Sequence, residues 1–375
     1  MSSITTYLRG SDTERLDPYP VKILKRVDRP TIRINEEKIQ RADEREAGFN
    51  KYRRGEFGND PKAKNTTHPL SDVLQNMQGL LRKSADGDVL VNLTPQSDDP
   101  EKITCHIKET AYFFRADLVG VCKLPPYAVY RYSNPTGDPI ELNHKYAIAI
   151  LVDQDWKTSE ASTGDDWIST SMAYRSYTAS GFIACMLADY IRRLGYPARA
   201  HMQGNNQIVI PPVLLWAGLG EMSRIGGALV NPFLGPRFKA AVVTTDLPLV
   251  PDRPIDFGLQ DFCAKCKKCA RECPSGAISS GDKIFRNGYE TWPMDVKKCT
   301  IYRRANKKGV GCGVCINVCP WNKPYTPFHR SVRWTMRNIP LLRNFAVWAD
   351  DIMGYGKPKR QNQWWMDLKV ADGEK

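Results

Sequence analysis

Apolar residues along the chain recur at two spacings, which predict helices and strands. Between Leu70 and Arg82 they recur every three or four residues, as in an amphipathic helix, and Ser71 is the expected N-cap of that helix. Residues 166–194 contain no proline and are followed by Gly195-Tyr-Pro197, which predicts a long helix with a sharp stop. Short apolar runs predict buried strands at 145–152, 198–202 and 240–245. Strands that alternate with helices indicate an α/β or α+β domain.

The chain divides into four parts by the strength of this pattern. The central part, residues 70–254, holds all the predicted strands, and a polar stretch at about 96–143 within it is expected to form an inserted lobe. Residues 1–69 are charged and turn-rich, so we expect an extended N-terminal arm. A cysteine-rich module at 255–327 and a C-terminal extension at 328–375 follow the central part.

The sequence shows neither a membrane span nor an export signal. The apolar runs, such as Tyr146–Val152, are too short to cross a bilayer. Met1–Gln40 is polar and lacks the twin-arginine pair and the apolar run of an export leader. We therefore expect a cytoplasmic protein, or an exported and membrane-associated one if a twin-arginine leader was removed.

Eight of the eleven cysteines lie in two runs that each end in Cys-Pro. The first run, Cys263-x2-Cys266-x2-Cys269-x3-Cys273-Pro274, has the bacterial iron–sulfur spacing. The second, Cys299-x12-Cys312-x2-Cys315-x3-Cys319-Pro320, has the same spacing with its leading cysteine displaced upstream. In such pairs the fourth ligand of each cluster comes from the other run. We therefore expect two [4Fe–4S] clusters, held by a first cysteine group (Cys263, Cys266, Cys269 and Cys319) and a second cysteine group (Cys299, Cys312, Cys315 and Cys273).

Two other uses of these cysteines fit the spacing less well. A zinc ribbon lacks the Cys-Pro endings, and disulfide bonds are incompatible with such dense C-x-x-C spacing. Two clusters side by side indicate a protein that moves single electrons.

The positive charge of the chain is concentrated around the cysteines. The net charge of +13 comes from 54 basic and 41 acidic residues, and twelve Lys or Arg against five Asp or Glu lie between Gln260 and Val310. Because a cluster with four thiolate ligands is anionic, part of this excess is local compensation. The rest is either ordinary solvated surface or a docking face for an acidic electron carrier, such as a ferredoxin or flavodoxin. This distribution argues against nucleic acid as a partner.

Glycines are dense in the second half of the central part. Such density lets the backbone approach a large flat ligand closely, although a set of tight turns would need the same residues. The candidate cofactor-binding glycines are Gly204, Gly218, Gly220 and Gly235.

Several segments, taken in order from Val21 to Pro324, resemble the catalytic subunit of the reductive dehalogenases. Besides both cysteine runs, they are Lys25-Arg-Val-Asp-Arg-Pro30, Gly218-Leu-Gly-Glu221, Gly235-Pro-Arg237, Thr245-Asp-Leu-Pro248 and Pro254-Ile-Asp-Phe-Gly258. The resemblance implies a nitroreductase-like α/β domain that binds a corrinoid (cobalamin), followed by a bacterial ferredoxin-like module with two [4Fe–4S] clusters. It also implies an oxidoreductase that reductively removes halogen from an organohalide substrate through cob(I)alamin.

The resemblance has consequences for cofactor and partners. The chain has no Asp-x-His-x-x-Gly segment, and its five histidines are scattered, which fits a corrinoid bound base-off. It also lacks the flavin and ferredoxin reductase portion of the longer family members, so a separate low-potential donor, a ferredoxin or flavodoxin, is expected. A membrane anchor subunit is a further candidate partner.

For the catalytic residues, the resemblance implies a tyrosine proton donor with a basic neighbour. Tyr177 is preferred because Arg237 follows it at about the separation that the family shows, and a nearby cation lowers the pKa of a phenol. Asn205 is a third candidate for the pocket. Tyr174, one helical turn earlier, and Lys239 are the respective alternatives to Tyr177 and Arg237.

Two other functions remain open from the sequence. Epoxyqueuosine reductase, a tRNA-modifying enzyme, shares the corrinoid domain and the paired clusters, but it carries a helical-repeat region for which this chain leaves little room. A non-catalytic corrinoid or electron carrier would bind the same cofactors without turnover.

Overall fold

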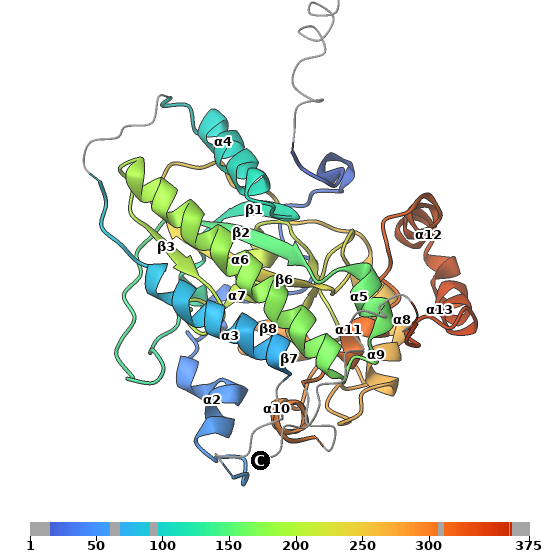
Figure 1. Ribbon diagram of the computed structural model, residues 1–375. Helices are drawn as coiled ribbons and strands as arrows, with labels where there is room; N and C mark the ends of the chain where they lie inside the picture. The colour runs from blue at the N-terminus through green and yellow to red at the C-terminus, as the bar shows by residue number, and fades with distance from the viewer. Residues whose placement is uncertain (1–15, 61–67, 91–96, 307–310, 360, 362–375) are drawn as a thin grey trace, which may run out of the picture.

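A four-stranded antiparallel sheet forms the centre of the molecule (Figure 1). The computed structural model describes residues 16–60, 68–90, 97–306, 311–359 and 361; the ends of the predicted arm and extension, residues 1–15 and 362–375, lie outside the described residues. The strands, in spatial order, are β1 (Leu118–Lys123), β2 (Tyr146–Asp153), β6 (Phe238–Thr245) and β3 (Ala198–His201). The last three are the predicted strands. Because all neighbours are antiparallel, the domain has the α+β form of the predicted fold class.

Both faces of the sheet are buried. Successive residues of β2 point to opposite faces: Ile148 and Ile150 belong to the core beneath the long helix, whereas Ala149 and Leu151 belong to the core on the other face. This double burial explains why β2 is an almost unbroken apolar run.

The long predicted helix is α6 (Trp167–Arg193), which packs across one face of the sheet (Figure 1). It begins where predicted, because the Asp166 carboxylate accepts a hydrogen bond from the Ser169 backbone N–H at 2.9 Å. Helices α3 (Pro69–Leu81) and α4 (Pro100–Phe113) pack beside it.

The predicted N-cap of α3 is wrong. The cap is His68, whose ring nitrogen accepts from the Leu70 N–H at 3.2 Å. Pro69 occupies the first helical position, where its missing N–H costs nothing, so the helix starts before Ser71. The Ser71 hydroxyl is instead buried 2.7 Å from that of Ser171 on α6.

Part of the stretch at about 96–143, which the sequence predicts to be an inserted lobe, belongs to the central sheet and to a helix that packs on it. Residues 118–123 form β1, which pairs along its whole length with β2, and α4 packs against it. The sequence Leu118-Val-Gly-Val-Cys122 is a short apolar run with a glycine in its middle, which weakens the strand signal.

The N-terminal arm lies across the rest of the protein. Isolated bridges join Arg26 to Ile255 and Ile34 to Tyr289, both in the cysteine-rich module. The arm contains the short helices η1 (Val21–Ile23), η2 (Glu36–Lys38), η3 (Glu44–Glu46) and α2 (Gly48–Arg53).

Short elements complete the two cores. Around the sheet they are η4 (Arg82–Ser84), η5 (Pro126–Ala128), α5 (Trp156–Ala161), α7 (Ile210–Trp216), β4 (Glu221–Met222) and β5 (Leu229–Val230). In the cysteine-rich module they are α8 (Leu259–Cys266), α9 (Lys268–Arg271), β7 (Ile284–Arg286), β8 (Tyr289–Thr291), α10 (Val296–Ala305) and α11 (Val314–Asn317).

A helical hairpin follows the cysteine-rich module. It consists of α12 (Pro327–Asn338), η6 (Pro340–Leu342) and α13 (Arg343–Ile352), and α13 packs against α8 (Figure 1). None of the helices in the described ranges combines the length and the apolar character that crossing a membrane would require.

Candidate functional site

The first cysteine group comes together from α8, α9 and the loop after α11. Lys267, with φ +53°, makes a left-handed turn between α8 and α9, so that Cys266 and Cys269 lie on one tight loop. Burial raises the pKa of the Cys319 thiol, and negative charge on Cys266 and Cys269 adds to the rise. Burial likewise raises the pKa of the Cys263 thiol, and negative charge at Cys319 and Cys266 adds to the rise. These four thiols are therefore mutual neighbours.

The second cysteine group shows the same relation. Burial raises the pKa of Cys315 to about 12, with contributions from Cys312, Cys299 and Cys273. Burial raises the pKa of the Cys269 thiol, and negative charge at Cys263 and at Cys315 of the second group adds to the rise, which places the two groups side by side. All eight are free thiols. Within the described ranges no set of three or more Cys, His, Asp or Glu is arranged around a single metal ion, so the grouping rests on these neighbour relations.

Tyr177 on α6 has a cation beside it, and that cation is Lys239. The Lys239 ammonium lies 5.0 Å from the centroid of the Tyr177 ring. The Tyr177 hydroxyl makes no hydrogen bond to another residue in the part of the chain that the structure describes, so it is free to meet a ligand. Tyr174 lies one turn earlier on the same helix.

Arg237, the predicted basic partner of Tyr177, is used elsewhere. Its guanidinium donates to both carboxylate oxygens of Asp153, at 2.7 and 3.0 Å, and to the Asn322 side-chain oxygen at 2.6 Å. The side chain is 3% exposed. Arg237 therefore joins the central sheet to the end of the second cysteine run, and the structure favours Lys239 as the neighbour of Tyr177.

Asn205 is also bound within the protein. Its side-chain oxygen accepts from Arg199 at 2.6 Å, and its amide donates to the Arg82 carbonyl at 3.0 Å. These bonds hold the loop after β3 against the end of α3. Both polar atoms of Asn205 thus have protein partners.

The four candidate cofactor-binding glycines are packed against protein atoms. A Cβ at Gly218 would meet the Arg253 carbonyl, and one at Gly235 would meet the Trp321 carbonyl; both have positive φ. At Gly204 a Cβ would meet the Arg82 guanidinium, and at Gly220 the Val230 carbonyl. This arrangement favours the alternative reading, in which the glycines permit tight turns and close packing.

Glu221 is a residue whose importance the sequence did not reveal. Its buried carboxylate accepts from the Thr31 hydroxyl of the arm and from the backbone N–H groups of Phe257 and Leu259 at the start of the cysteine-rich module. Burial raises the pKa of this carboxyl, and these hydrogen bonds lower it in part. Glu221 lies within one of the motif segments, but its partners are at least 36 residues away, so no local signal marks them.

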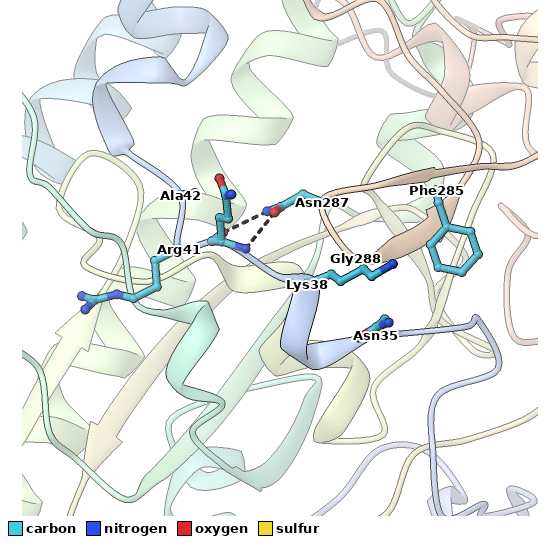
Figure 2. A pocket seen from close by; sticks show the side chains of 8 residues that line it. Asn35, Lys38, Arg41, Ala42, Phe285, Asn287 and Gly288 are labelled. Carbon is cyan, nitrogen blue, oxygen red and sulfur yellow. Dashed lines mark hydrogen bonds between the residues drawn. The ribbon is translucent and has the colours of Figure 1, made fainter.

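A depression of about 790 Å³ lies between the arm and the β7–β8 hairpin. Figure 2 shows Asn287 bonded to the backbone of Gln40 at this place, with Lys38 and Phe285 on the same side. The Arg41 guanidinium points away and donates to main-chain carbonyls of residues 129, 130 and 140. None of the lining residues is a predicted site residue.

Comparison with known proteins identifies relatives of this arrangement. Residues 262–322 match the family described as "4Fe-4S double cluster binding domain". The chain is 34% identical over 307 residues to a tetrachloroethene reductive dehalogenase of Sulfurospirillum multivorans, covering 72% of this chain and 60% of that protein. Another from Desulfitobacterium hafniense strain Y51 is 35% identical over 225 residues, which is 57% of this chain and 39% of that one.

Solved structures agree with this result. The catabolic reductive dehalogenase NpRdhA is 41% identical, with a TM-score of 0.90 over 94% of this chain and 52% of its own. An epoxyqueuosine reductase of Cyclobacterium marinum matches a smaller part, at 31% identity over 121 residues, which is 28% of this chain and 34% of that enzyme. The chain thus spans between 39% and 60% of the length of these three reductive dehalogenases. The predicted resemblance, the mixed fold and the double-cluster module are confirmed.

Proposed function

We propose that this protein is a reductive dehalogenase, which uses two [4Fe–4S] clusters and a base-off corrinoid to replace a carbon-bound halogen with hydrogen. The observation that carries the proposal is the structural match over 94% of the chain to NpRdhA, at 41% identity. A reductive dehalogenase structure with the same degree of similarity is one for which a B12-dependent dehalogenation mechanism is suggested.

Unpartnered buried oxygens fit a corrinoid. In the described residues, the side-chain oxygens of Gln203 and Asn206, on either side of Gly204, are buried without a hydrogen-bond partner. Since buried polar groups normally have partners, these atoms are available to the amide groups around a corrin ring. When bound and reduced, the corrinoid supplies two electrons and a nucleophilic cobalt.

His201 is not available as a ligand below such a cofactor. It is fully buried, its Nε2 lies 2.8 Å from the Thr244 hydroxyl, and its Nδ1 lies within hydrogen-bonding distance of Arg199 and the Gln207 N–H. Burial and the Arg199 charge lower the pKa of this imidazole well below its usual value. These contacts agree with the base-off binding proposed.

Tyr177 is the proposed proton donor. The reaction consumes the organohalide, two electrons and one proton, and it yields the hydrogenated carbon and a halide ion. Tyr177 transfers the proton from its hydroxyl to the carbon that loses the halogen. The adjacent Lys239 ammonium stabilises the phenolate left behind, because a positive charge favours the ionised form of a phenol. Tyr174 is the second candidate for the donor.

The eight cysteines of the two groups hold the clusters that bring the electrons. The proposed source is a separate low-potential ferredoxin or flavodoxin, for which the basic residues around the cysteines provide a docking face. A membrane anchor subunit is a further proposed partner.

The proposal is tested by anaerobic reconstitution with iron, sulfide and cobalamin. Halide release from a panel of halogenated compounds is then measured with reduced methyl viologen as the electron source. Halide release that depends on added cobalamin is the expected result. Bound iron and corrinoid without halide release would point to a carrier, and the absence of corrinoid binding would refute the proposal.

The proton donor is tested by Tyr177→Phe, with Tyr190→Phe on the same helix as a control. Tyr177→Phe should retain iron and corrinoid but lose at least about 100-fold in turnover, the range expected for loss of general acid catalysis. Tyr190 bonds to His106 at 2.7 Å, so its variant should retain activity. Full activity of Tyr177→Phe, combined with loss of activity in Tyr174→Phe, would move the role to Tyr174.

A further inference from the structure

Two lysines and an aspartate form a buried charge network at the junction of α13 and the cysteine loops. One oxygen of the Asp350 carboxylate lies 2.6 Å from the Lys268 ammonium, and the other lies 2.8 Å from the Lys323 ammonium. The three side chains are 4, 8 and 5% exposed for Lys268, Lys323 and Asp350. Lys268 and Lys323 also donate to main-chain carbonyls, of residues 355 and 322 respectively.

Both lysines of the network lie close in sequence to ligands of the first cysteine group. Lys268 stands in the chain between Cys266 and Cys269, and Lys323 follows Cys319 by four residues. Both lysines therefore belong to loops that supply the first cysteine group. In Figure 1, α13 lies beside α8, which carries the other ligands of that group.

The charges of the network lie close to these ligands, because Lys268 directly precedes Cys269 in the chain. By Coulomb's law an ammonium group stabilises negative charge nearby, and a carboxylate opposes it. The lysines and the aspartate therefore have opposite effects on negative charge at the first cysteine group.

A purely structural role accounts poorly for such a network. Removing three charges from water is costly, and apolar side chains of similar volume often replace a buried ion pair without loss of stability. With two ammonium groups and one carboxylate, the buried network carries net positive charge next to an anionic cofactor. Asp351 also lies 2.7 Å from Lys268, but it is 37% exposed and therefore screened by solvent.

We propose that the Lys268–Asp350–Lys323 network sets the reduction potential of the cluster bound by the first cysteine group. Reduction adds one electron from the external donor to that cluster, with no bond formed or broken. The two ammonium groups stabilise the added negative charge, and the Asp350 carboxylate opposes it. The inference rests on the cluster assignment within the proposed function, but it does not depend on dehalogenation.

The proposal predicts shifts of opposite sign. Asp350→Asn removes the negative charge and raises the midpoint potential of one cluster, whereas Lys323→Met removes a positive charge and lowers it. At a fixed potential, each variant should change the ratio of reduced to oxidised cluster at least tenfold, which corresponds to about 59 mV for one electron. The midpoint of the other cluster should stay unchanged.

The measurement is an electron paramagnetic resonance titration of the reconstituted full-length chain at controlled potentials, with iron content determined in parallel. Asp99→Asn is the matched control. Asp99 lies at the start of α4, away from the cysteine loops in sequence, and pairs with Lys102, which is 76% exposed, so the same chemical change should leave both midpoints in place. Lys323→Arg retains the positive charge and should keep the wild-type midpoint.

Several outcomes would overturn the proposal. Unchanged midpoints in Asp350→Asn and Lys323→Met, both with full iron content, would show that the network is only structural. Shifts of the same sign in the two variants would exclude a charge effect. If Asp350→Asn failed to retain iron, the comparison of the midpoint potentials of Lys323→Met and Lys323→Arg would test the proposal by itself. Even if the wild type released no halide, the midpoint potentials of its clusters could still be measured. Failure of the proposed dehalogenase function can therefore be distinguished from failure of this proposal.

Discussion

His329 should stay neutral at a pH at which an ordinary histidine is protonated. It lies in the first turn of α12, where Nδ1 is 2.8 Å from the Thr326 hydroxyl and Nε2 is 3.0 Å from the Tyr355 hydroxyl. Burial lowers its pKa from 6.5 to about 4, and the positive charges of Lys323 and Arg333 contribute to this change. Protonation of His329 would therefore work against the packing of the C-terminal hairpin.

The sign and size of the effect on stability follow from proton binding. Between pH 6.5 and 4 the unfolded chain binds a proton at this histidine that the folded chain does not, so the free energy of unfolding falls as the pH falls. One pH unit corresponds to about 1.36 kcal/mol, so about 2 kcal/mol is lost by pH 5. Because the side chain is partly exposed, solvent screening reduces the expected loss to about 1–2 kcal/mol.

Two measurements test this expectation. In an NMR titration of the histidine rings, with His329 assigned by comparison with His329→Gln, its signal should remain that of a neutral ring at pH 5. In urea unfolding followed by tryptophan fluorescence, the wild type should lose about 1–2 kcal/mol more than His329→Gln between about pH 7.5 and pH 5. His106→Gln, at an exposed position, is the control and should behave like the wild type.

A protonation midpoint of His329 near 6.5 would refute the reasoning. Parallel pH profiles for wild type and His329→Gln would do the same, because they would show that this ring does not distinguish the folded from the unfolded chain.

Three further changes test the framework around the clusters. Arg237→Met leaves the partly buried Asp153 carboxylate without its partner and should lower the free energy of unfolding by about 3–5 kcal/mol in urea denaturation. Gly235→Ala, at φ +64° with the Trp321 carbonyl in the way, should cost more than about 1 kcal/mol and lower Tm. Cys319→Ser removes one of four ligands and should reduce bound iron by roughly half in a colorimetric iron assay.

Each of these changes has a control elsewhere in the chain. Arg193→Met breaks a solvent-exposed pair with Asp189 and should cost less than about 1 kcal/mol. Gly227→Ala has φ +81° but open space around the new methyl group, so it should cost less than Gly235→Ala. Cys185→Ser, in the core, should keep full iron content. Equal effects in a variant and its control would contradict the corresponding assignment.

The sequence predicted those parts of the fold that local patterns determine. The helix α6 contains no proline and is followed by Gly195-Tyr-Pro197, and β2 is an almost unbroken apolar run, so both were found with nearly correct ends. The cysteine spacing predicted the cluster module, because both runs contain closely spaced cysteines and end in Cys-Pro. The strand β1 was missed because its apolar run is short and contains Gly120.

Contacts between distant residues could not be predicted. Arg237 and Lys239 are two residues apart, and which of them approaches Tyr177 depends on Asp153, 84 residues earlier, which binds Arg237. Similarly, Asp350 reaches Lys268 across 82 residues. Such choices depend on how the elements dock against one another, and no local pattern encodes that docking.

The route of the N-terminal arm has a consequence for how the protein matures. Arg26 pairs with Ile255 and Ile34 with Tyr289, so the part of the chain that the ribosome makes first finds its partners only late in synthesis. The first cysteine group is likewise incomplete until Cys319 has emerged, and Asp350 is made later still. The proposed first cluster therefore cannot be completed before Cys319 has been made, and chains interrupted before that residue lack one of its four proposed ligands.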